Sequence, residues 1–478
     1  MIDQIRLLGR GLFIPQPDNR GQERLRRAGL TGITAMLSHG LVIATGLISV
    51  PLTINYLGQE RYGVWLTINS LLNWLAVANL GFSGNALINS LAEANGKDDR
   101  ELERELVATA FWSLIGLAVL LSVVFAVIFP MISWPAVFNV TSSVSLGELH
   151  WAVILSLAGF VLMFPLNITG TIYQGYQAGY IGNVWSMAGS ILSLMALVGV
   201  TRFQGGLIHL VLAMFGVRIL VLLVNLGYLF CWQYPWLRPL PSAATRRSFR
   251  RLLSLGSKYL VAQVAGIGMF HSQPMIIAQV LGPVQVGIFN VAQRLLTLPL
   301  LMIQLFAFPL LSAYGEAHAR QDWSWIRRTF WRSLIISTLV GVVLAVGLAA
   351  FVVPIIRVWA GPAMVPEPGL ITWLTVYVLV AVVATPASVM LYGLERVGGQ
   401  AVAALINALG TILLGIWFTR AWGLSGTAAA MALSLAAVNL TVQFIMVRSA
   451  LRAMASQQPS ERTVQQYGFN FDVETRLH

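Results

Sequence analysis

The sequence predicts an all-α integral membrane protein with about twelve transmembrane helices. Hydrophobic residues make up 57% of the 478 positions, charged residues only 10%, and the mean hydropathy is +0.75. Soluble domains contain roughly 25% charged residues, whereas a helix that crosses a bilayer needs about 20 apolar residues in succession. The apolar segments lack the alternation of barrel strands, so helices are the structure that satisfies their backbone groups in lipid.

Twelve apolar segments are long enough to cross a membrane. In chain order they are residues 31–54, 62–88, 107–129, 150–173, 181–201, 206–231, 257–281, 284–312, 329–353, 369–393, 400–419 and 423–447. The connection at 95–105 is acidic and is predicted to be a solvated connector, in which Asp98 with Glu101 could form a capping box.

The longest basic connection, residues 232–256, divides the chain into two halves. Its prolines end helices, and its RRSFRR cluster is expected to bind anionic lipid head groups. The predicted organisation is a cytoplasmic N-terminal segment (1–30), a six-helix bundle (31–231), this linker (232–256), a second six-helix bundle (257–447) and a cytoplasmic tail (448–478).

The net charge of +12 follows the predicted topology. Most of the 30 Lys and Arg residues lie before the first helix, in alternate loops and in the tail. Only four lie on the opposite side: Arg61, Arg202, Arg357 and Arg420. By the positive-inside rule both termini are cytoplasmic, and this distribution argues against nucleic acid as the partner of the basic charge.

A short turn recurs in corresponding places of the two halves. The stretch LGQERYGVW (57–65) becomes LGPVQVGIF (281–289), and AWGLSGTAA (421–429) parallels FQGGLIHL (203–210). The shared residues of the first pair are glycines, which permit a tight outer turn, whereas Glu60 and Arg61 are replaced by Val284 and Gln285. We expect a parallel duplication, giving two pseudo-symmetric six-helix bundles.

The titratable groups inside the predicted spans are all basic. Apart from His150 at the very start of span 150–173, they are His39, His209, Arg218, Lys258, His271, Arg294 and Arg332, and every Asp and Glu lies outside the spans or at their ends. Charges inside a membrane are costly and usually face a cavity or a partner. Lys258 and Arg332 lie near cytoplasmic ends, from which long side chains can reach the interface.

Arg294 is the strongest candidate for function. It lies ten residues into helix 8, about 15 Å deep at ~1.5 Å per residue, and its guanidinium stays charged and needs water or a ligand. Arg218 is similarly deep in helix 6, where a cavity and a structural partner are equally good explanations. His39 and His271 are as well explained by neutral, hydrogen-bonded imidazoles.

Polar residues line the same faces of four helices. Asn69 and Asn73 lie one turn apart on helix 2, Asn290 and Arg294 one turn apart on helix 8, and His271 precedes Pro274, where a kink would free carbonyls. Such faces either bond helices together or, with helices 1, 2, 7 and 8, line a hydrated cationic cavity. The candidate binding residues are Arg294, His271, His39, Arg218, Asn69, Asn73, Asn290 and Lys258.

The chemistry of this set fits a phosphate that carries sugars, because arginine binds phosphate in a bidentate manner and amides suit sugar hydroxyls. We predict no cofactor and no metal site. The single cysteine, Cys231, excludes an internal disulfide and a cysteine-cluster metal site, and we expect it to be buried.

The pattern PLTINYLGQERYGVW (51–65), the ANLGF at 78–82 and the acidic connector after it resemble the polysaccharide flippases of the MOP superfamily (Wzx-like, O-antigen type). The resemblance implies two six-helix bundles and a V-shaped cavity bordered by helices 1, 2, 7 and 8. It further implies a flippase of the bacterial inner membrane that moves a polyprenyl-diphosphate-linked oligosaccharide, the precursor of lipopolysaccharide O-antigen, to the outer leaflet. Its partners would be membrane lipids and other membrane proteins of polysaccharide assembly. No family motif is strict enough to assign site residues.

Two alternatives are open. A multidrug or other small-molecule exporter of the same superfamily would typically carry carboxylates inside the membrane, and none is present in the predicted spans. The twelve predicted spans also differ from the relatives that flip the peptidoglycan precursor, which usually have fourteen. A membrane-embedded polymerase or ligase would need a catalytic base or nucleophile, and the largest outer loop, 130–149, offers Glu148 as its only carboxylate. A transporter rather than an enzyme is therefore predicted.

Overall fold

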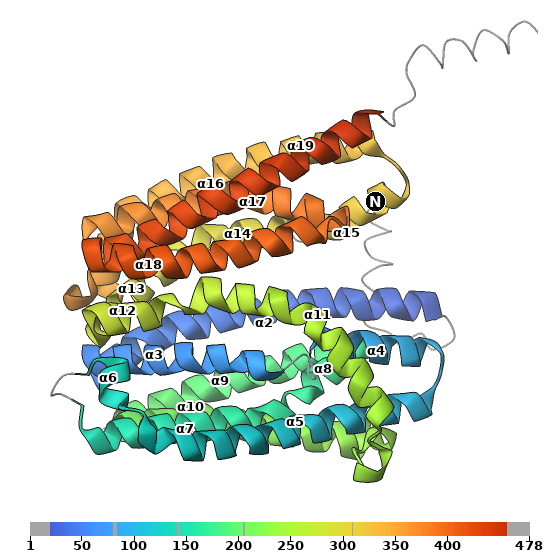
Figure 1. The fold of residues 1–478 in the computed structure, drawn as a ribbon, viewed down its shortest axis with the longest axis horizontal. Helices are drawn as coiled ribbons and strands as arrows, with labels where there is room; N and C mark the ends of the chain where they lie inside the picture. Colours follow the sequence, from blue (N-terminus) through green and yellow to red (C-terminus); the bar gives the residue numbers. More distant parts are fainter. Residues whose placement is uncertain (1–19, 80–83, 141–143, 204–205, 308, 457–478) are drawn as a thin grey trace, which may run out of the picture. The chain divides into compact units, whose positions relative to one another are not determined.

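The computed structural model describes residues 20–79, 84–140, 144–203, 206–307 and 309–456, and its regular structure there is helical throughout. The chain forms two compact units (Figure 1). Unit 1 comprises Met1–Ile288 with Val358–Met364, and unit 2 comprises Phe289–Arg357 with Val365–His478.

The helices of unit 1 run from α2 to α12. They are α2 (Arg20–Leu57), α3 (Gln59–Leu75), η1 (Ala76–Asn79), α4 (Asn85–Gly96), α5 (Arg100–Ile128), η2 (Phe129–Met131), α6 (Trp134–Phe138), α7 (Leu146–Leu166), α8 (Ile168–Gly175), α9 (Gly179–Phe203), α10 (Gly206–Tyr228), η3 (Leu229–Gln233), η4 (Pro235–Leu237), η5 (Pro241–Ala243), α11 (Arg246–His271) and α12 (Gln273–Leu281), and η6 (Pro362–Met364) belongs to the same unit.

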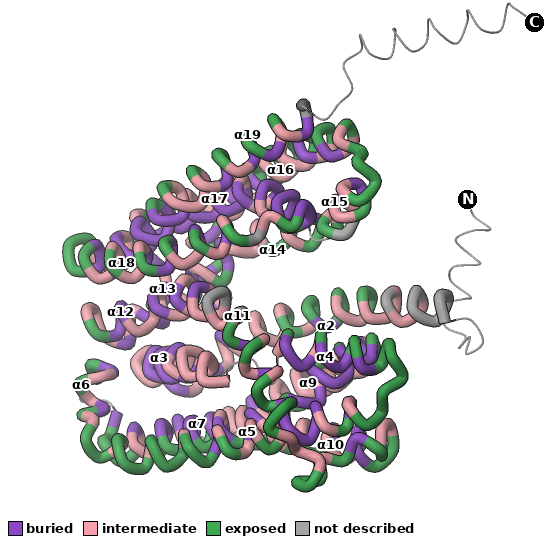
Figure 2. The backbone as a smooth tube through the Cα atoms, turned by 45° about the vertical axis from the view of Figure 1, so that its right-hand side comes forward, coloured by how far each residue is buried: buried purple, intermediate pink, exposed green. Residues whose placement is uncertain are grey.

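The chain passes into unit 2 within α13 (Pro283–Leu296). The remaining helices are α14 (Leu298–Ala307), α15 (Pro309–Ala319), α16 (Trp323–Trp359), α17 (Pro368–Gly393), α18 (Val397–Ser434), η7 (Leu435–Leu440) and α19 (Thr441–Ser456). Within unit 2, α17 is buried along much of its length (Figure 2). The division of the chain at 232–256 into two six-helix bundles stays a prediction.

Ten helical segments of the described residues are long and apolar enough to cross a membrane. One of them, Gly398–Met454, has 57 residues and contains a break where Trp422 (φ −128°) and Gly423 (φ 61°) leave the helical conformation. It therefore accounts for two of the predicted spans, and the prediction of an all-helical, multi-span membrane protein is confirmed.

The predicted span 62–88 is the exception. Helix α3 ends at Leu75 and α4 begins only at Asn85, while residues 80–83 lie outside the described residues. The intervening sequence contains Asn79 and Gly84, residues that favour turns and helix ends over helix interiors.

The core of unit 1 encloses a polar network as well as apolar side chains. Leu87, Leu106 and many neighbours from α4, α5 and α8 are fully buried. Among them the Tyr173 hydroxyl donates to Asn225 Oδ1 at 2.8 Å, and Asn225 Nδ2 donates to Thr169 Oγ1 at 3.0 Å. Tyr173, Asn225 and Thr169 thus satisfy one another, as burial in a low-dielectric interior requires.

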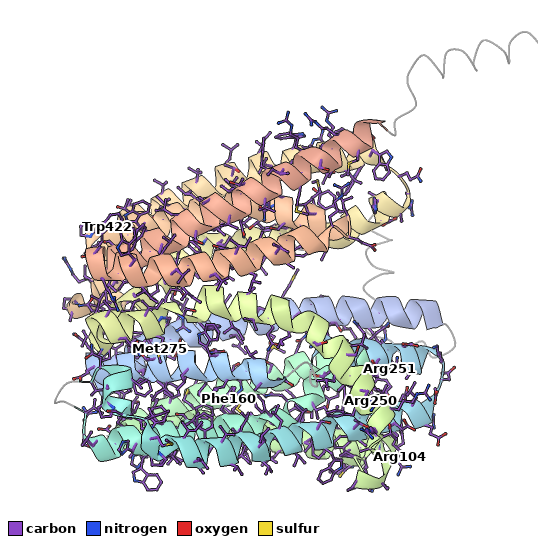
Figure 3. The ribbon with its side chains drawn as sticks, in the orientation of Figure 1. Arg104, Phe160, Arg250, Arg251, Met275 and Trp422 are labelled. Atoms are coloured by element: carbon purple, nitrogen blue, oxygen red, sulfur yellow. The ribbon has the colours of Figure 1, made fainter. Side chains whose placement is uncertain are left out.

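The acidic connector and the basic linker meet at one end of unit 1. Arg251 Nη2 donates to Glu93 Oε2 at 2.6 Å, and Thr245 Oγ1 donates to Glu105 Oε2 at 3.2 Å. Arg250 and Arg251 on α11 and Arg104 on α5 lie at this end (Figure 3). The connector is therefore tied to the linker by charge-assisted hydrogen bonds and is not merely solvated.

The start of α5 is capped one residue later than predicted. Asp99, not Asp98, is the N-cap, and its side chain accepts from the Leu102 N–H at 3.0 Å. Asp98 instead has a left-handed backbone, φ 54°. The alternative of an Asp98–Glu101 capping box is therefore not formed, because the chain needs one more residue to turn between α4 and α5.

The two copies of the repeated turn have the same backbone geometry. Gly58 has φ 77° and ψ 171°, and Gly282 has φ 91° and ψ 165°. This region of conformational space is essentially restricted to glycine, so the shared glycines are required by the turn itself. The expectation of a tight, glycine-dependent turn at both places is confirmed.

The two copies also pack against each other inside unit 1. A Cβ on Gly63 would lie 1.7 Å from the carbonyl oxygen of Pro283, and a Cβ on Gly287 would lie 3.3 Å from the ring of Tyr62. Gly63 and Gly287 occupy the same position of the repeat. The absence of a side chain there allows helix backbones to approach closely, as small residues do at helix interfaces in membranes.

Each unit contains the same kind of carboxylate-to-backbone hydrogen bond at the start of a helix. Glu148 Oε1 accepts from the Leu207 N–H at 3.0 Å in unit 1, and Glu367 Oε1 accepts from the Ser425 N–H at 3.0 Å in unit 2. In both cases a carboxylate next to the first turn of one helix caps the entry into a later helix, where it satisfies a backbone donor that has no partner within that helix. The same device in two places supports the internal duplication.

Candidate substrate-binding residues

Helices α3 and α11 of unit 1 are joined by polar side chains. The Ser70 hydroxyl donates to the carbonyl oxygen of His271, and Gln263 Nε2 donates to the carbonyl oxygen of Ala76 at 3.1 Å. Sequence reasoning did not include Ser70 or Gln263. The signal for Gln263 was present, because an amide in the middle of an apolar span needs a partner.

The break between α11 and α12 explains why the His271 carbonyl is available. Pro274 has no N–H to continue the helical hydrogen bonds, and α11 ends at His271. The Ser272 hydroxyl donates to Gly268 O at 2.6 Å and Gln273 Nε2 to Met269 O at 2.8 Å. The local sequence thus builds a break whose exposed carbonyls are satisfied by hydroxyl and amide side chains.

The two asparagines of α3 keep part of their hydrogen-bonding capacity. Asn69 Nδ2 donates to Trp65 O at 2.7 Å, and Asn73 Nδ2 donates to Asn69 O at 2.8 Å. Both side chains are half-buried. An asparagine amide has two donor hydrogens and an acceptor oxygen, so each residue can still bind a hydroxyl or water beside its own helix.

Of the remaining predicted residues of unit 1, His39 and Arg218 form no hydrogen bond with this cluster within the described part of the chain. His39 is exposed on α2. Arg218 lies on α10, at the helical spacing of Val211 and Asn225, which are 0% and 3% exposed, yet its own side chain is accessible. The side chain of Lys258 lies outside the described residues.

In unit 2 the predicted pair lies one turn before another helix break. Asn290 is half-buried and Arg294 is exposed on α13. The helix is interrupted at Thr297, whose hydroxyl donates to Gln293 O at 2.8 Å, and Pro299 follows in α14. Proline again removes a backbone donor in mid-span. The predicted spans 257–281 and 284–312 are therefore both discontinuous next to a candidate residue.

Glu148, the carboxylate that a polymerase or ligase would need as a catalytic base, already accepts hydrogen bonds from other groups of the protein. Glu148 receives hydrogen bonds from Arg61 Nε at 3.0 Å and Arg61 Nη2 at 3.1 Å, in addition to the Leu207 N–H. It is 15% exposed. A carboxylate saturated by three donors is a structural anchor rather than an accessible base.

Cys231 is exposed, at the irregular helix end η3. The expectation that it is a buried residue was wrong. It lies just after the end of α10 and shortly before the prolines of the linker. It is therefore at the end of the apolar segment and not in the packed interior.

The fold is that of the MOP-superfamily transporters. An inward-facing multidrug resistance MATE family transporter of that superfamily superposes with a TM-score of 0.73 at 13% identity, covering 88% of this chain and 96% of the other. The lipid II flippase MurJ in an inward closed conformation gives 0.66 at 15% identity, over 88% and 87%. A MOP-superfamily transporter from Pyrococcus furiosus, described as having a binding pocket of reverse polarity, gives 0.62 at 14% identity, over 90% and 97%.

The sequence itself identifies the family. Residues 31–314, more than half of the chain, match the family of polysaccharide biosynthesis proteins, and the chain belongs to that family. A search of curated protein sequences found no significant match. The resemblance to membrane proteins of polysaccharide biosynthesis with a MOP-superfamily fold is thus confirmed.

Proposed function

We propose that this protein is a flippase that moves a polyprenyl-diphosphate-linked oligosaccharide from the inner to the outer leaflet of a bacterial inner membrane by alternating access, in the synthesis of O-antigen or a related polysaccharide. The observation that carries the proposal is the chemistry of the spans. Arginine lies at mid-membrane depth in helix 8, asparagines line helix 2, and no acid falls within the predicted spans.

The residues have separate roles in this proposal. Arg294 contacts the diphosphate, because a guanidinium binds phosphate oxygens through paired hydrogen bonds. Asn69, Asn73 and Asn290 bind sugar hydroxyls with amide donors and acceptors. The breaks beside His271 and Thr297 put irregular backbone next to the candidate residues, and such backbone is tolerated at membrane depth where it is buried in protein or lines a cavity.

The membrane potential favours this direction of transport. Moving a charge across a potential of 100 mV is worth about 2.3 kcal/mol, so two negative charges carried outward gain roughly 4–5 kcal/mol if no counter-ion accompanies them. A cationic substrate would be driven the other way and repelled by Arg294. The family match to polysaccharide biosynthesis supports the glycan part of the substrate.

The deciding experiment measures the leaflet in which the lipid-linked oligosaccharide resides. Cells that lack the protein should accumulate it in the inner leaflet, where an impermeant reagent added from outside does not reach it. Arg294→Ala should reduce outward movement about tenfold or more, the expected effect of losing a charged hydrogen-bond donor, and Arg294→Lys should be intermediate.

Arg420→Ala is the matched control, since Arg420 is an exposed arginine outside the candidate set. It should transport normally. Full complementation by Arg294→Ala, with protein levels equal to wild type, would overturn the assignment of the diphosphate to Arg294. Export of cationic drugs with no change in lipid-linked glycan would overturn the proposed function.

A further inference from the structure

A pocket inside unit 2, lined by none of the candidate substrate-binding residues, has an unusual combination of polar groups. It has a volume of about 280 Å³ and lies among α14, α15, α16 and α17. Apolar side chains make up much of its lining, and its polar lining residues are Tyr314, Thr329, Arg332, Ser333 and Ser337. None of the residues that line it is acidic.

Two of these polar groups are without partners in the part of the chain that the structure describes. The Tyr314 side chain is fully buried, and its hydroxyl makes no hydrogen bond of good geometry, although the Ser333 side chain lies beside it. Arg332 forms no ion pair with any described carboxylate. The Ser333 hydroxyl, in contrast, donates to Phe330 O at 2.9 Å. A buried hydroxyl without a partner costs free energy, which indicates that a ligand group completes it.

Tyr314 is held in place by its surroundings. A Cβ on Gly393 of α17 would lie 2.5 Å from the Tyr314 Cβ, so the two backbones approach as closely as glycine allows. The Tyr314 ring also meets the ring of Trp325 edge-on, with centroids 5.7 Å apart. The ring of this pocket-lining residue is thus held by a rigid frame, and its hydroxyl cannot turn away to find water.

The surroundings of the pocket are those of a lipid-facing surface at the edge of the hydrocarbon layer. Phe306 is 79% exposed and Ile336 is 61% exposed, and both line it. Residues 334–353 of α16 form an uncharged stretch of membrane-spanning length, and Arg332 directly precedes it. Beyond Arg332 the helix carries Arg327 and Arg328, toward the side predicted to be cytoplasmic.

We propose that this pocket binds an anionic phospholipid of the cytoplasmic leaflet. The phosphate accepts hydrogen bonds from the Arg332 guanidinium and the Tyr314 hydroxyl, and an acyl chain follows the exposed apolar surface past Phe306 and Ile336. Charge complementarity selects the ligand, because the only charged lining residue is a cation. An arginine at the lipid interface pairs with phosphate better than with water alone. This site is independent of the proposed substrate and its transport.

Native mass spectrometry of the purified full-length protein tests the proposal. Delipidated protein is titrated with phosphatidylglycerol, phosphatidylcholine or undecaprenyl phosphate, and bound lipid is counted. Phosphatidylglycerol should bind in preference to phosphatidylcholine. Arg332→Gln should weaken phosphatidylglycerol binding about tenfold, as expected for a charged hydrogen-bonding group, and Tyr314→Phe should weaken it by a smaller factor.

Arg327→Gln is the matched control, because Arg327 lies on the same helix, is exposed and does not line the pocket. It should bind phosphatidylglycerol as wild type does. Thermal unfolding without added lipid should be the same for Arg332→Gln and wild type, which shows that the variant is folded. Equal binding of phosphatidylcholine, equal loss in both arginine variants or preferential binding of undecaprenyl phosphate would each overturn the proposal.

Discussion

Arg61 holds the carboxylate of Glu148 from two sides of its guanidinium, with Nε 3.0 Å from Oε1 and Nη2 3.1 Å from Oε2. The same carboxylate accepts the Leu207 N–H. One acid therefore joins the turn between α2 and α3 to the start of α7 and the start of α10. Arg61 lies within the repeated turn. The second copy has Gln285 at this position, so the ion pair belongs to the first copy alone.

Removing either partner of this pair should destabilise unit 1 unequally. Arg61→Gln should cost about 1 kcal/mol, since the pair is only partly buried. Glu148→Gln should cost about 2–3 kcal/mol, because it weakens the hold on both Arg61 and the Leu207 N–H. Denaturant unfolding in detergent measures both. Lys97→Gln, which breaks the exposed Lys97–Glu93 pair, should change little, and an equal effect of all three would contradict this ranking.

Close backbone packing at the repeated turn should make Gly63 intolerant of any side chain. Gly63→Ala would place a methyl group 1.7 Å from Pro283 O, so the helices must move apart and folded protein should be lost. Gly40→Ala is the control, because nothing lies within 4 Å of its Cβ position. Yield of monodisperse protein after detergent extraction is the measurement. Normal yield of Gly63→Ala would show that this contact is not maintained.

The link between α3 and α11 should be detectable through Ser70. Ser70→Ala removes the donor to the His271 carbonyl and leaves that group without its partner at the helix break. The expected cost is about 1 kcal/mol, the usual value of one such hydrogen bond. Hydrogen exchange around residues 271–276 should rise. Ser190→Ala, whose hydroxyl bonds only within its own helix, should leave exchange there unchanged.

The tie between the acidic connector and the basic linker should depend on pH. Hydrogen bonding to Lys97 and the charge of Arg251 lower the pKa of Glu93 below its ordinary value of 4.5. The stabilisation is therefore present above pH 4.5 and is lost as pH falls through the lower, folded-state pKa. Wild type should melt slightly above Glu93→Gln at pH 7, and the two melting curves should converge as the pH falls below the lowered pKa of Glu93. A constant difference across this range would contradict the role of Glu93.

The spans were predictable because twenty apolar residues in lipid leave the backbone few alternatives to a helix. The glycine turns were predictable because Gly58 and Gly282 repeat in sequence. The pairing of Arg61 with Glu148 was not, since nothing local relates positions that meet only through helix packing. Cys231 was misplaced for the same reason: residue type gives an average burial, whereas burial itself depends on which helices surround the residue.

Candidate site residues show the same limit. The sequence identified His271, Asn69 and Asn73 as polar residues of neighbouring helices, and the structure joins those helices. It could not identify Ser70, because a serine in a helix usually bonds to its own backbone. The unpartnered hydroxyl of Tyr314 was equally invisible, since burial without a partner is a property of the packed structure.

Because unit 1 contains a segment from late in the chain, it can be completed only after part of unit 2 has been synthesised. Unit 1 includes Val358–Met364, and there the indole of Trp359 donates to Leu47 O at 3.0 Å. That segment is synthesised only after helices α14 to α16 of unit 2. The first unit therefore waits for its final piece while much of the second is already in the bilayer, and a ribosome that stalls before residue 358 would leave both units unfinished.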